Sequence, residues 1–442
     1  MVTHRDDKHW MMDSSLPLVQ WFVCIQILLI VGSTVQAGRE FQQQASQQRR
    51  LQPYTDNTND VPQHSPPVKS FLVSDGSWID CIPIEGQIAA HHQTLQEHNI
   101  QMGPSTQARR SRHAPGTSQL HPQLFAREHG SCPQGSIPVQ RIDPDRPSLK
   151  KSRIPTVSTS IAGPGAAPGE THEYAVTGLP QSAHSYSGAY AFFSVNGPVL
   201  EAPQQDFSLS QVWIIDGHWN DGTLSTIEVG WQTYPLLHPN DKPLAPHLFI
   251  FWTNNAYNYS GCYNLECPGF VQYDSKWVIG GAMPYYTTLG ENRKRELEVE
   301  IEVLYDPTQL SWWLYVNNDP VGYWPASIFD GRLRGSANLV QWGGEIVFFK
   351  RGNGISHSKT GMGSGAFPVG GYPVAAYQRN ISFADASGDY YDAKPSVLKQ
   401  QRILNDPHCY NITIQQGNFR NWGTYFFFGG SGGNNSGCAG KE

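Results

Sequence analysis

One stretch of the sequence, residues 224–235, predicts a strand that carries a carboxylate on its polar face. Apolar and polar residues alternate along it, which is the period-two pattern of a strand with one buried face and one open face. The apolar set is Ile227, Val229 and Trp231. Glu228 lies on the other face, where its neighbour Gly230 has no side chain. The pattern therefore indicates a glutamate with room beside it.

Residues 339–349 repeat this arrangement. Their apolar face is predicted to carry Val340, Trp342, Ile346 and Phe348. Glu345 lies on the opposite face, two residues from Gly343, and Gln341 shares that face. We hypothesise that Glu345 and Glu228 meet across one sheet. The alternative is that each glutamate is only a solvated residue on the polar face of its strand, which is common for this residue type.

Two neighbouring glutamates could activate a water molecule. Two carboxylates held close together do not both ionise easily, so they tend to share one proton in mild acid. The ionised carboxylate could take a proton from water, while the protonated one donates to a scissile carbonyl and stabilises the oxyanion. We favour Glu228 as the base, although little in the sequence decides between the two. Gln211 or Gln341 could supply a further amide donor, and a structural hydrogen bond is the alternative for both.

The sequence predicts neither a metal site nor a cofactor. It contains no His-Glu-x-x-His zinc motif. His91, His92 and His98 lack metal-ligand spacing and are expected at the surface. The glycine-rich run 352–371 has no strand before it and no helix after it, so we interpret it as a loop and not as a nucleotide-binding cradle.

The composition is that of an aromatic-rich, turn-rich all-β protein. Charged residues make up 15% of the 442 residues, against about 25% in typical soluble domains. From residue 170 onward, short strands separated by Gly, Pro and Asn turns predict an antiparallel β-sandwich or jelly roll over 170–442. The predicted strands are 172–176, 187–194, 207–216, 225–234, 247–253, 270–273, 298–305, 311–316, 321–325, 339–349, 376–381, 410–415 and 424–428. The net charge of −6 offers no basic patch, so nucleic acid is not an expected partner.

The first 169 residues predict a leader, a small module and two linkers. The apolar run 16–31, followed by small residues up to Ala37, predicts a signal peptide over 1–37 and a soluble, secreted mature protein; a signal anchor is the alternative. No other apolar run is long enough to cross a bilayer, so no membrane contact is expected after signal removal. Residues 38–69 are expected to form a disordered linker, and 141–169 a second linker. Between them, residues 70–140 predict a small α+β module with a hairpin over 70–84 and a helix over 88–100.

Six cysteines remain after removal of the leader, an even number that suits disulfides in an oxidising compartment. Cys262 with Cys267 could close one loop, and Cys409 with Cys438 could join the last strands. Local partners are the simplest pairing, but the sequence leaves the pairing open, including that of Cys81 and Cys132. Four Asn-x-Ser/Thr sites agree with secretion; they are Asn258, Asn380, Asn411 and Asn434.

Ten short motifs, in one order, resemble the plant neprosin family. Three resemble its activation peptide: Asp80-Cys-Ile-Pro-Ile84, Ile100-Gln-Met-Gly-Pro104 and Cys132-Pro-Gln-Gly-Ser-Ile-Pro138. Seven resemble its catalytic domain: His172-Glu-Tyr-Ala175, Ser208-Leu-Ser-Gln-Val-Trp213, Thr226-Ile-Glu-Val-Gly-Trp-Gln232, Gly261-Cys-Tyr-Asn-Leu265, Gly269-Phe-Val-Gln272, Gly322-Tyr-Trp-Pro325 and Gln341-Trp-Gly-Gly-Glu-Ile346. The resemblance runs from about Ser70 to near the C-terminus.

This resemblance implies a secreted glutamic endopeptidase that cuts after proline in acid and is made as a zymogen. Its expected location is extracellular, in the apoplast or cell wall, and its expected substrates are proline-containing peptides or proteins. The family's two catalytic glutamates would correspond to Glu228 and Glu345. Its disulfides would correspond to Cys262–Cys267 and Cys409–Cys438.

Two further expectations follow from the resemblance. A substrate proline would suit an aromatic pocket, for which Tyr323 and Trp324 are available, whereas Trp231 and Trp342 face the core. The pro-segment should act as an inhibitor that covers the glutamate face at neutral pH. Acid should release it by protonating carboxylates and histidines at the contact.

Two other functions remain open. The chain could be a catalytically inactive β-sandwich that binds cell-wall glycan, with the glutamates vestigial or bound to sugar hydroxyls. It could also be a glycosidase, because carboxylate pairs about 5–5.5 Å apart serve retaining glycosidases. The sequence does not identify the natural substrate, the site at which the pro-segment is cut, the oligomeric state, or whether activity is retained.

Overall fold

The computed structural model describes residues 49–54, 63–105, 121–142, 169–182, 185–218, 222–241, 244–257, 261–289, 297–349, 357–417 and 421–438. The predicted signal peptide, much of the two predicted linkers, and Asn258 lie outside these residues. Residues Arg50–Glu442 form one compact unit. None of the described helices is both long enough and apolar enough to cross a membrane.

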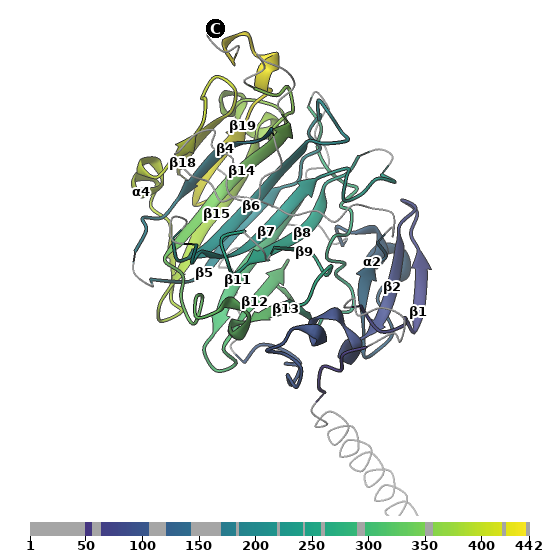
Figure 1. Ribbon diagram of the computed structural model, residues 1–442. Coiled ribbons are helices and arrows are strands. Elements are labelled where there is room, and N and C mark those ends of the chain that lie inside the picture. Colours follow the sequence, from purple (N-terminus) through teal and green to yellow (C-terminus); the bar gives the residue numbers. More distant parts are fainter. Residues whose placement is uncertain are drawn as a thin grey trace, which may run out of the picture. The chain divides into compact units, whose positions relative to one another are not determined.

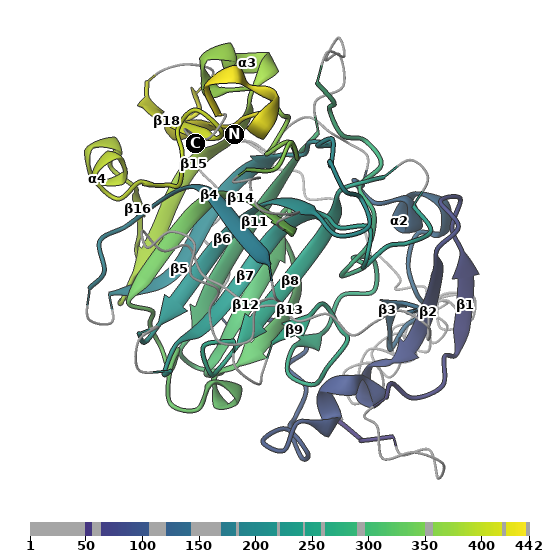
Figure 2. The same cartoon turned by 45° about the horizontal axis from the view of Figure 1, so that its top comes forward.

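Two large antiparallel sheets form the main domain (Figures 1 and 2). The first has seven strands in the order β17-β4-β14-β6-β7-β8-β9. Their bounds are β4 Glu170–Gly178, β6 Phe207–Asp216, β7 Ser225–Thr233, β8 His247–Thr253, β9 Cys262–Tyr263, β14 Leu339–Phe349 and β17 Ile403–Leu404. This sheet carries both candidate glutamates.

The second sheet has nine strands in the order β10-β13-β12-β11-β5-β15-β19-β18, with β16 paired to β15. Their bounds are β5 Tyr186–Ser194, β10 Val271–Gln272, β11 Glu298–Asp306, β12 Ser311–Val316, β13 Asp319–Pro325, β15 Ala376–Asp385, β16 Tyr390–Asp392, β18 Asn411–Gln416 and β19 Thr424–Gly429. The helical turns between strands are short: η3 Ala326–Phe329, η4 Pro368–Gly370, α3 Gly371–Val374, α4 Pro395–Gln400, η6 Gly432–Asn434 and η7 Ser436–Cys438.

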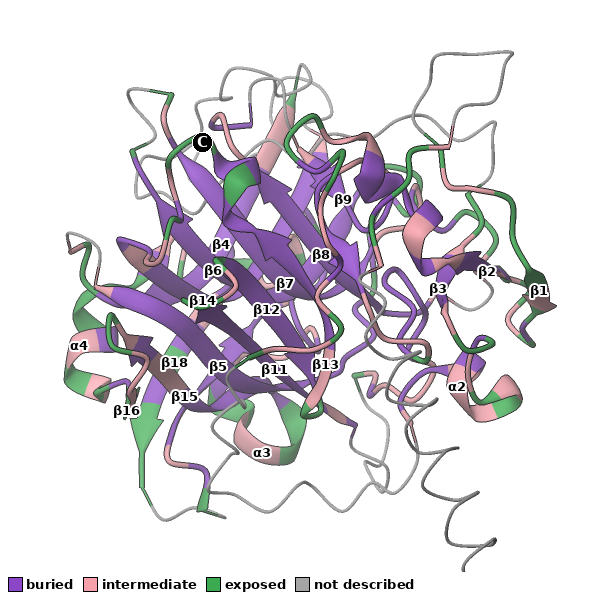
Figure 3. Ribbon diagram, turned by 90° about the horizontal axis from the view of Figure 1, so that it is seen from below, coloured by how far each residue is buried: buried purple, intermediate pink, exposed green. Residues whose placement is uncertain are grey.

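The core lies between the two sheets, whose strands are buried along most of their length (Figure 3). The predicted alternation of β7 and β14 holds, because Trp231 and Trp342 are fully buried in this core. The Trp231 indole N–H donates to the backbone carbonyl of Ser194 on the opposite sheet at 2.8 Å. This contact fixes which face of β7 points inward, and Glu228 therefore lies on the face turned away from the second sheet.

The predicted fold class is confirmed, and each predicted strand overlaps an observed one. In the described part of the main domain, the sequence missed only short strands: β9, β16 and β17 span two or three residues each. The predicted helix over 88–100 is wrong. Only a 3-10 turn, η2 Ile88–His91, forms there. Ala89, Ala90 and Leu95 are all buried while Gln93, Thr94, Gln96 and Glu97 are exposed, so the segment separates its apolar and polar side chains without forming an α-helix.

The pro-segment module, meaning the described part of residues 63–142, contains a small sheet of its own. Strands β1 Lys69–Leu72, β2 Trp78–Pro83 and β3 Ser136–Gln140 pair in that order, with η1 Ile84–Gly86 after β2 and helix α2 Leu124–His129 before β3. A disulfide joins Cys81 to Cys132, the pair that the sequence left open. The module is thus a small α+β unit with its own covalent link.

Two buried glutamines attach the module to the main domain. The side-chain amide of Gln87 accepts from the backbone N–H of Gln272 at 2.8 Å and donates to its carbonyl at 3.1 Å. The side-chain amide of Gln123 likewise accepts from the backbone N–H of Val278 at 2.8 Å and donates to its carbonyl at 2.7 Å. Each glutamine therefore mimics a neighbouring β-strand, and Gln87 does so along the edge strand β10.

Aromatic contacts complete this attachment. His121 packs on Trp277 with ring centroids 4.1 Å apart, and His98 contacts Tyr323 through a 2.9 Å hydrogen bond to its hydroxyl. These contacts place the module against β10, β13 and residues 264–285. We expected it to cover the glutamate face; the described contacts run instead to the edge of the sandwich, where β10 is the last strand of its sheet.

A second row of glutamates lies on the nine-stranded sheet. Glu298, Glu300 and Glu302 alternate along β11 on the face opposite the core residues Val299 and Ile301. Tyrosine hydroxyls donate to all three: Tyr377 to Glu298 at 2.8 Å, Tyr190 to Glu300 at 2.8 Å and Tyr390 to Glu302 at 2.6 Å. Burial raises the pKa of Glu302 to about 8, and the nearby Glu300 adds to this effect.

We predict that Glu302→Gln stabilises the protein near neutral pH. The folded pKa of Glu302 lies above its unfolded value, so the unfolded chain loses this proton first, and stability falls as pH rises from about 4.5 to about 8. Glutamine mimics the protonated carboxyl. The melting temperature of the variant should exceed that of wild type by about 2–4 °C at pH 7 and equal it at pH 4. Calorimetry at both pH values measures this, and equal shifts at both would contradict it.

Candidate active site

Strand β6 aligns the two glutamate-bearing strands. It pairs with β7 on one side and with β14 on the other, so three residues form each row across the sheet. One row joins Glu228, Trp213 and Gln341; a second joins Gln232, Leu209 and Glu345. Both glutamates therefore lie on the same face of one sheet, at opposite corners of a patch centred on β6.

The centre of this patch is Gln211, which lies between Gly230 and Gly343. A Cβ added to Gly230 would lie 2.8 Å from Cβ of Gln211 and even closer to the backbone of β6. At Gly343, a Cβ would lie 2.3 Å from the carbonyl oxygen of Ala175. The two glycines do make room, as the sequence predicted, but Gln211 and the neighbouring strands fill it.

Three neutral donors hold Glu228. Gln211 donates from Nε2 to Oε2 at 2.7 Å, and Tyr257 and Thr226 donate to Oε1 at 2.6 Å and 3.1 Å. Burial and the nearby Glu228 carboxylate raise the pKa of Tyr257 well above its usual range, so its hydroxyl keeps its proton. Tyr257 follows β8 in a turn with a positive φ of 63°, which aims its ring at the sheet.

Glu345 has a different environment. Its Oε1 lies 2.6 Å from Nδ1 of His172, and Nε2 of the same ring lies 2.8 Å from a carboxylate oxygen of Glu170. Both side chains come from β4, the strand beside β14. Burial alone would lower the pKa of His172, but the hydrogen bonds to Glu170 and Glu345 raise it above its ordinary value. Glu345 thus faces a cation in mild acid, whereas Gln211, Tyr257 and Thr226, which donate to Glu228, are uncharged.

The glutamate face is closed to solvent in this structure. Glu228, Glu345 and Gln211 are each 0% exposed. Aromatic residues surround them, including Tyr174, Tyr257 and Tyr263. Burial is the main cause that raises the pKa of Tyr263 well above its usual range, and Glu345 and Glu228 both add to it, so this hydroxyl lies within electrostatic reach of both carboxylates. Any molecule that contacts these carboxyl groups must therefore displace part of this cover.

The structure brings only some of the predicted binding residues to this face. Gln211 and Gln341 lie on it, beside the glutamates. Tyr323 and Trp324 do not, because β13 belongs to the other sheet. The Tyr323 hydroxyl is bonded to the pro-segment module, and Trp324 packs edge-on against Phe270. Their expected contact with a substrate proline has no support from this placement.

The sequence-based prediction missed three residues of the face. Tyr257 and His172 lie 29 and 173 residues from the glutamates that they contact, so spacing gave no signal. Gln232 did leave a signal. The segment Glu-Val-Gly-Trp-Gln on β7 is nearly the reverse of Gln-Trp-Gly-Gly-Glu on β14, and this inverted pattern pairs a glutamate with a glutamine in each row.

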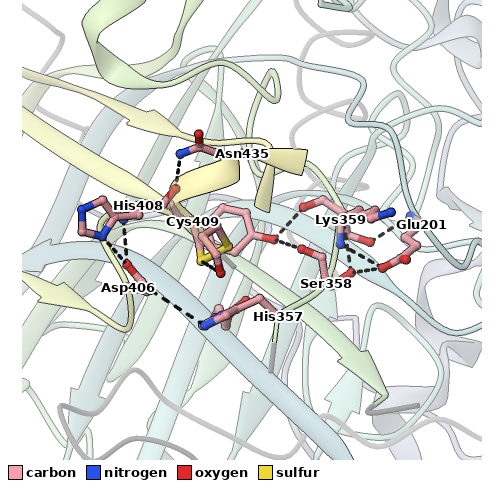
Figure 4. Close-up of a disulfide and its surroundings, with 12 residues drawn as sticks. Glu201, His357, Ser358, Lys359, Asp406, His408, Cys409 and Asn435 are labelled. Atoms are coloured by element: carbon pink, nitrogen blue, oxygen red, sulfur yellow. Dashed lines mark hydrogen bonds and ion pairs between the residues drawn. A yellow bond between two sulfur atoms is a disulfide. The ribbon is translucent and has the colours of Figure 1, made fainter. Parts of the chain in front are cut away.

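Two disulfides lie in the described part of the main domain. Cys262–Cys267 and Cys409–Cys438 are the pairs that the family resemblance implied. Beside Cys409 and Cys438 lies His357, and this cluster has residue types that bind metals (Figure 4). The two cysteines are joined to each other, however, so no thiolates remain to serve as metal ligands.

The predicted glycosylation sites differ in exposure. Asn434 is exposed and Asn411 is half-buried. Asn380 is 4% exposed, so the folded protein hides its amide. Glycosylation of the two accessible sites remains a prediction.

Structural comparison finds distant matches. A scytalido-glutamic peptidase bound to a peptide-based transition-state analogue matches with 11% identity and a TM-score of 0.29, covering 59% of this chain and all of the peptidase. A second structure of scytalido-glutamic peptidase with a transition-state analogue inhibitor gives 12% identity and a TM-score of 0.31, covering 58% and 98% of the two chains. A β-porphyranase from the gut bacterium Bacteroides plebeius gives 9% identity and a TM-score of 0.15, covering 42% and 53%.

Two protein-family models match the sequence. The neprosin model matches residues 204–431, which contain both candidate glutamates, and the neprosin activation peptide model matches residues 70–178. The first match alone spans just over half of the 442 residues. The chain therefore belongs to the neprosin family of glutamic peptidases and carries that family's activation peptide.

Proposed function

We propose that this protein is a secreted, acid-active endopeptidase that cleaves on the carboxyl side of proline. Glu228 and Glu345 together activate water, and the activation peptide keeps the enzyme latent at neutral pH. The expected site of action is extracellular, in the apoplast or cell wall. The observation that carries this proposal is the placement of the two glutamates on one face of one sheet, each buried and each held by its own set of hydrogen-bond partners.

The chemistry follows from two carboxyl groups in opposite protonation states. The ionised carboxylate takes a proton from water as the water oxygen attacks the scissile carbonyl carbon. The protonated carboxyl donates to the carbonyl oxygen and stabilises the tetrahedral intermediate. When the intermediate collapses, the C–N bond breaks and the departing amine takes the proton that the base removed from water. Buried surroundings strengthen these contacts, because few water dipoles compete with them.

Two amide side chains are suited to hold the substrate backbone. Gln232 is 1% exposed and Gln341 is 5% exposed, and the side-chain oxygen of each has no hydrogen-bond partner among the described residues. Leaving a buried acceptor unpaired costs about 1–3 kcal/mol. Backbone N–H groups on either side of a substrate proline would satisfy both oxygens, while the proline itself offers none.

We predict that either Glu228→Gln or Glu345→Gln lowers cleavage after proline by about 10²–10⁴-fold, because each removes one half of the acid–base pair. The measurement uses acid-treated protein, a proline-rich peptide library, and mass spectrometry of the products. Glu302→Gln is a matched control, since it is the same substitution at a buried strand glutamate on the other sheet. It should keep wild-type cleavage.

Two outcomes would overturn this proposal. Cleavage that persists in both site variants would remove the glutamates from the mechanism. A folded, acid-treated wild type that cleaves no peptide but is retained on a polysaccharide column would favour the glycan-binding alternative, and cleavage of the polysaccharide would favour the glycosidase.

Histidines at the module contact supply a route to acid activation. Nδ1 of His64 accepts the backbone N–H of Ile88 at 3.2 Å, while Nε2 contacts the carbonyl of Leu265 in the main domain at 3.1 Å. Nδ1 of His121 likewise accepts a backbone N–H, that of Gln123, at 3.2 Å. A proton on Nδ1 would break either bond. Burial lowers the pKa of both rings to about 4.

We predict that the double variant His64→Gln/His121→Gln releases the module at lower pH than wild type. Both folded pKa values lie below the unfolded value of 6.5, so the attachment weakens as pH falls from 6.5 toward 4. Removing these two groups should lower the midpoint of release by about 0.5–1 pH unit. Hydrogen exchange at the amides of Gln272 and Val278 reports release directly, because both amides bond to module glutamines.

The exposed His408 provides the control, since its ring is 69% exposed and lies outside the module contact. His408→Gln should leave the midpoint unchanged. An unchanged midpoint in the double variant would show that these histidines do not drive release.

A further inference from the structure

The hydrogen bond of His172 to Glu345 is part of a longer series of hydrogen bonds that also includes Glu170. Its Nδ1 lies 2.6 Å from Oε1 of Glu345, and its Nε2 lies 2.8 Å from Oε1 of Glu170. A carboxylate oxygen accepts hydrogen bonds but cannot donate them, so both contacts are satisfied when both ring nitrogens carry protons. The geometry thus suits an imidazolium ring between two carboxylates.

The surroundings of His172 favour this charge. Its side chain is 1% exposed, and that of Glu345 is 0% exposed. Among the described residues, the charged groups that face the ring are Glu170 on its own strand and Glu345 on β14. Tyr174, which is uncharged, stacks on the ring, and the row of paired residues that contains His172 continues with Val347 and Phe207. With little water present, the ring and Glu345 interact more strongly than exposed groups would.

We propose that His172 is a positioning residue that, held by Glu170, keeps Glu345 ionised in acid and so makes Glu345 the base of the dyad. This inference rests on the proposed peptidase function and adds two residues to its mechanism. His172 touches no reacting atom; it acts through Glu345. The carboxylate of Glu170 fixes the ring's orientation and supports its positive charge.

Glu228 is suited to the opposite role. Its partners on Oε1 are the hydroxyls of Tyr257 and Thr226, and a hydroxyl can either donate a hydrogen bond or accept one. A proton on Glu228 is therefore accommodated by rotating these hydroxyls, whereas a proton on Glu345 would face the N–H of His172. This reverses the preference for Glu228 as base that the sequence suggested.

The test is the pH profile of kcat/KM for a proline-containing peptide, measured on acid-activated wild type and His172→Asn. Asparagine keeps an N–H donor near Glu345 but removes the positive charge. The acidic limb of the profile should shift to higher pH by about 1–3 pH units, because the variant lacks the positive charge of the His172 ring that favours ionised Glu345. Below that limb kcat should fall while KM changes less than about twofold. A profile that does not move, with only stability altered, would make His172 a structural residue and overturn the proposal.

The matched control is His357→Asn. His357 pairs through Nδ1 with Glu173 at 2.5 Å, and Glu173 lies on the same strand β4 but on its other face (Figure 4 shows His357 beside the disulfide). This variant also removes a histidine that is paired with a buried glutamate. Its pH profile should match that of wild type; an equal shift would show that the effect is not specific to Glu345.

A second measurement separates this inference from the proposed function. If wild type cleaves no peptide, the peptidase proposal fails, and carboxyl ¹³C NMR of Glu345 still decides the role of His172. Glu345 should titrate at higher pH in His172→Asn than in wild type, and equal titration in both would overturn the inference. In Glu170→Gln, the His172 ring should lose its proton at lower pH than in wild type.

Discussion

The register of β7 and β14 on β6 is the constraint on which the rest of the site depends. It places a glutamate and a glutamine in each of two rows and leaves Gln211 between two glycines. A slip of one residue would turn each carboxylate into the core between the sheets. The buried Trp231, tied to Ser194 on the opposite sheet, opposes such a slip because its indole would lose both its packing and its hydrogen bond.

Acid acts in opposite directions on different parts of the chain. At the module contact, His64 and His121 are neutral when bound, so protons weaken the attachment. On the nine-stranded sheet, Glu302 is buried as a protonated carboxyl, so the same protons favour the folded catalytic domain. At the glutamate face, the positive charge on His172 persists to higher pH than usual, because the hydrogen bonds to Glu170 and Glu345 outweigh the effect of burial on its pKa. In the proposed activation, one fall in pH therefore loosens the attachment of the module while stabilising the main domain.

Much of this could be predicted from the sequence, because alternation reports directly on strands whose two faces differ. The alternation identified the strands, the tryptophans that point into the core, and the shared face of Glu228 and Glu345. It failed where tertiary packing overrides local pattern, as in residues 88–100, where buried contacts replace an amphipathic helix. It also failed to exclude Tyr323, because the sequence does not show which of two sheets a strand joins. His172 was missed because it meets Glu345 only through strand pairing.

The most direct test of the central claim is a crystal structure of the acid-treated Glu345→Gln protein with a proline-containing peptide bound. We expect the peptide to lie across β6 on the glutamate face, with the carbonyl carbon of proline between Glu228 and residue 345 and the aromatic cover displaced. A peptide bound elsewhere, with Glu228 still buried beneath Tyr257, would contradict the claim that this face is the catalytic one.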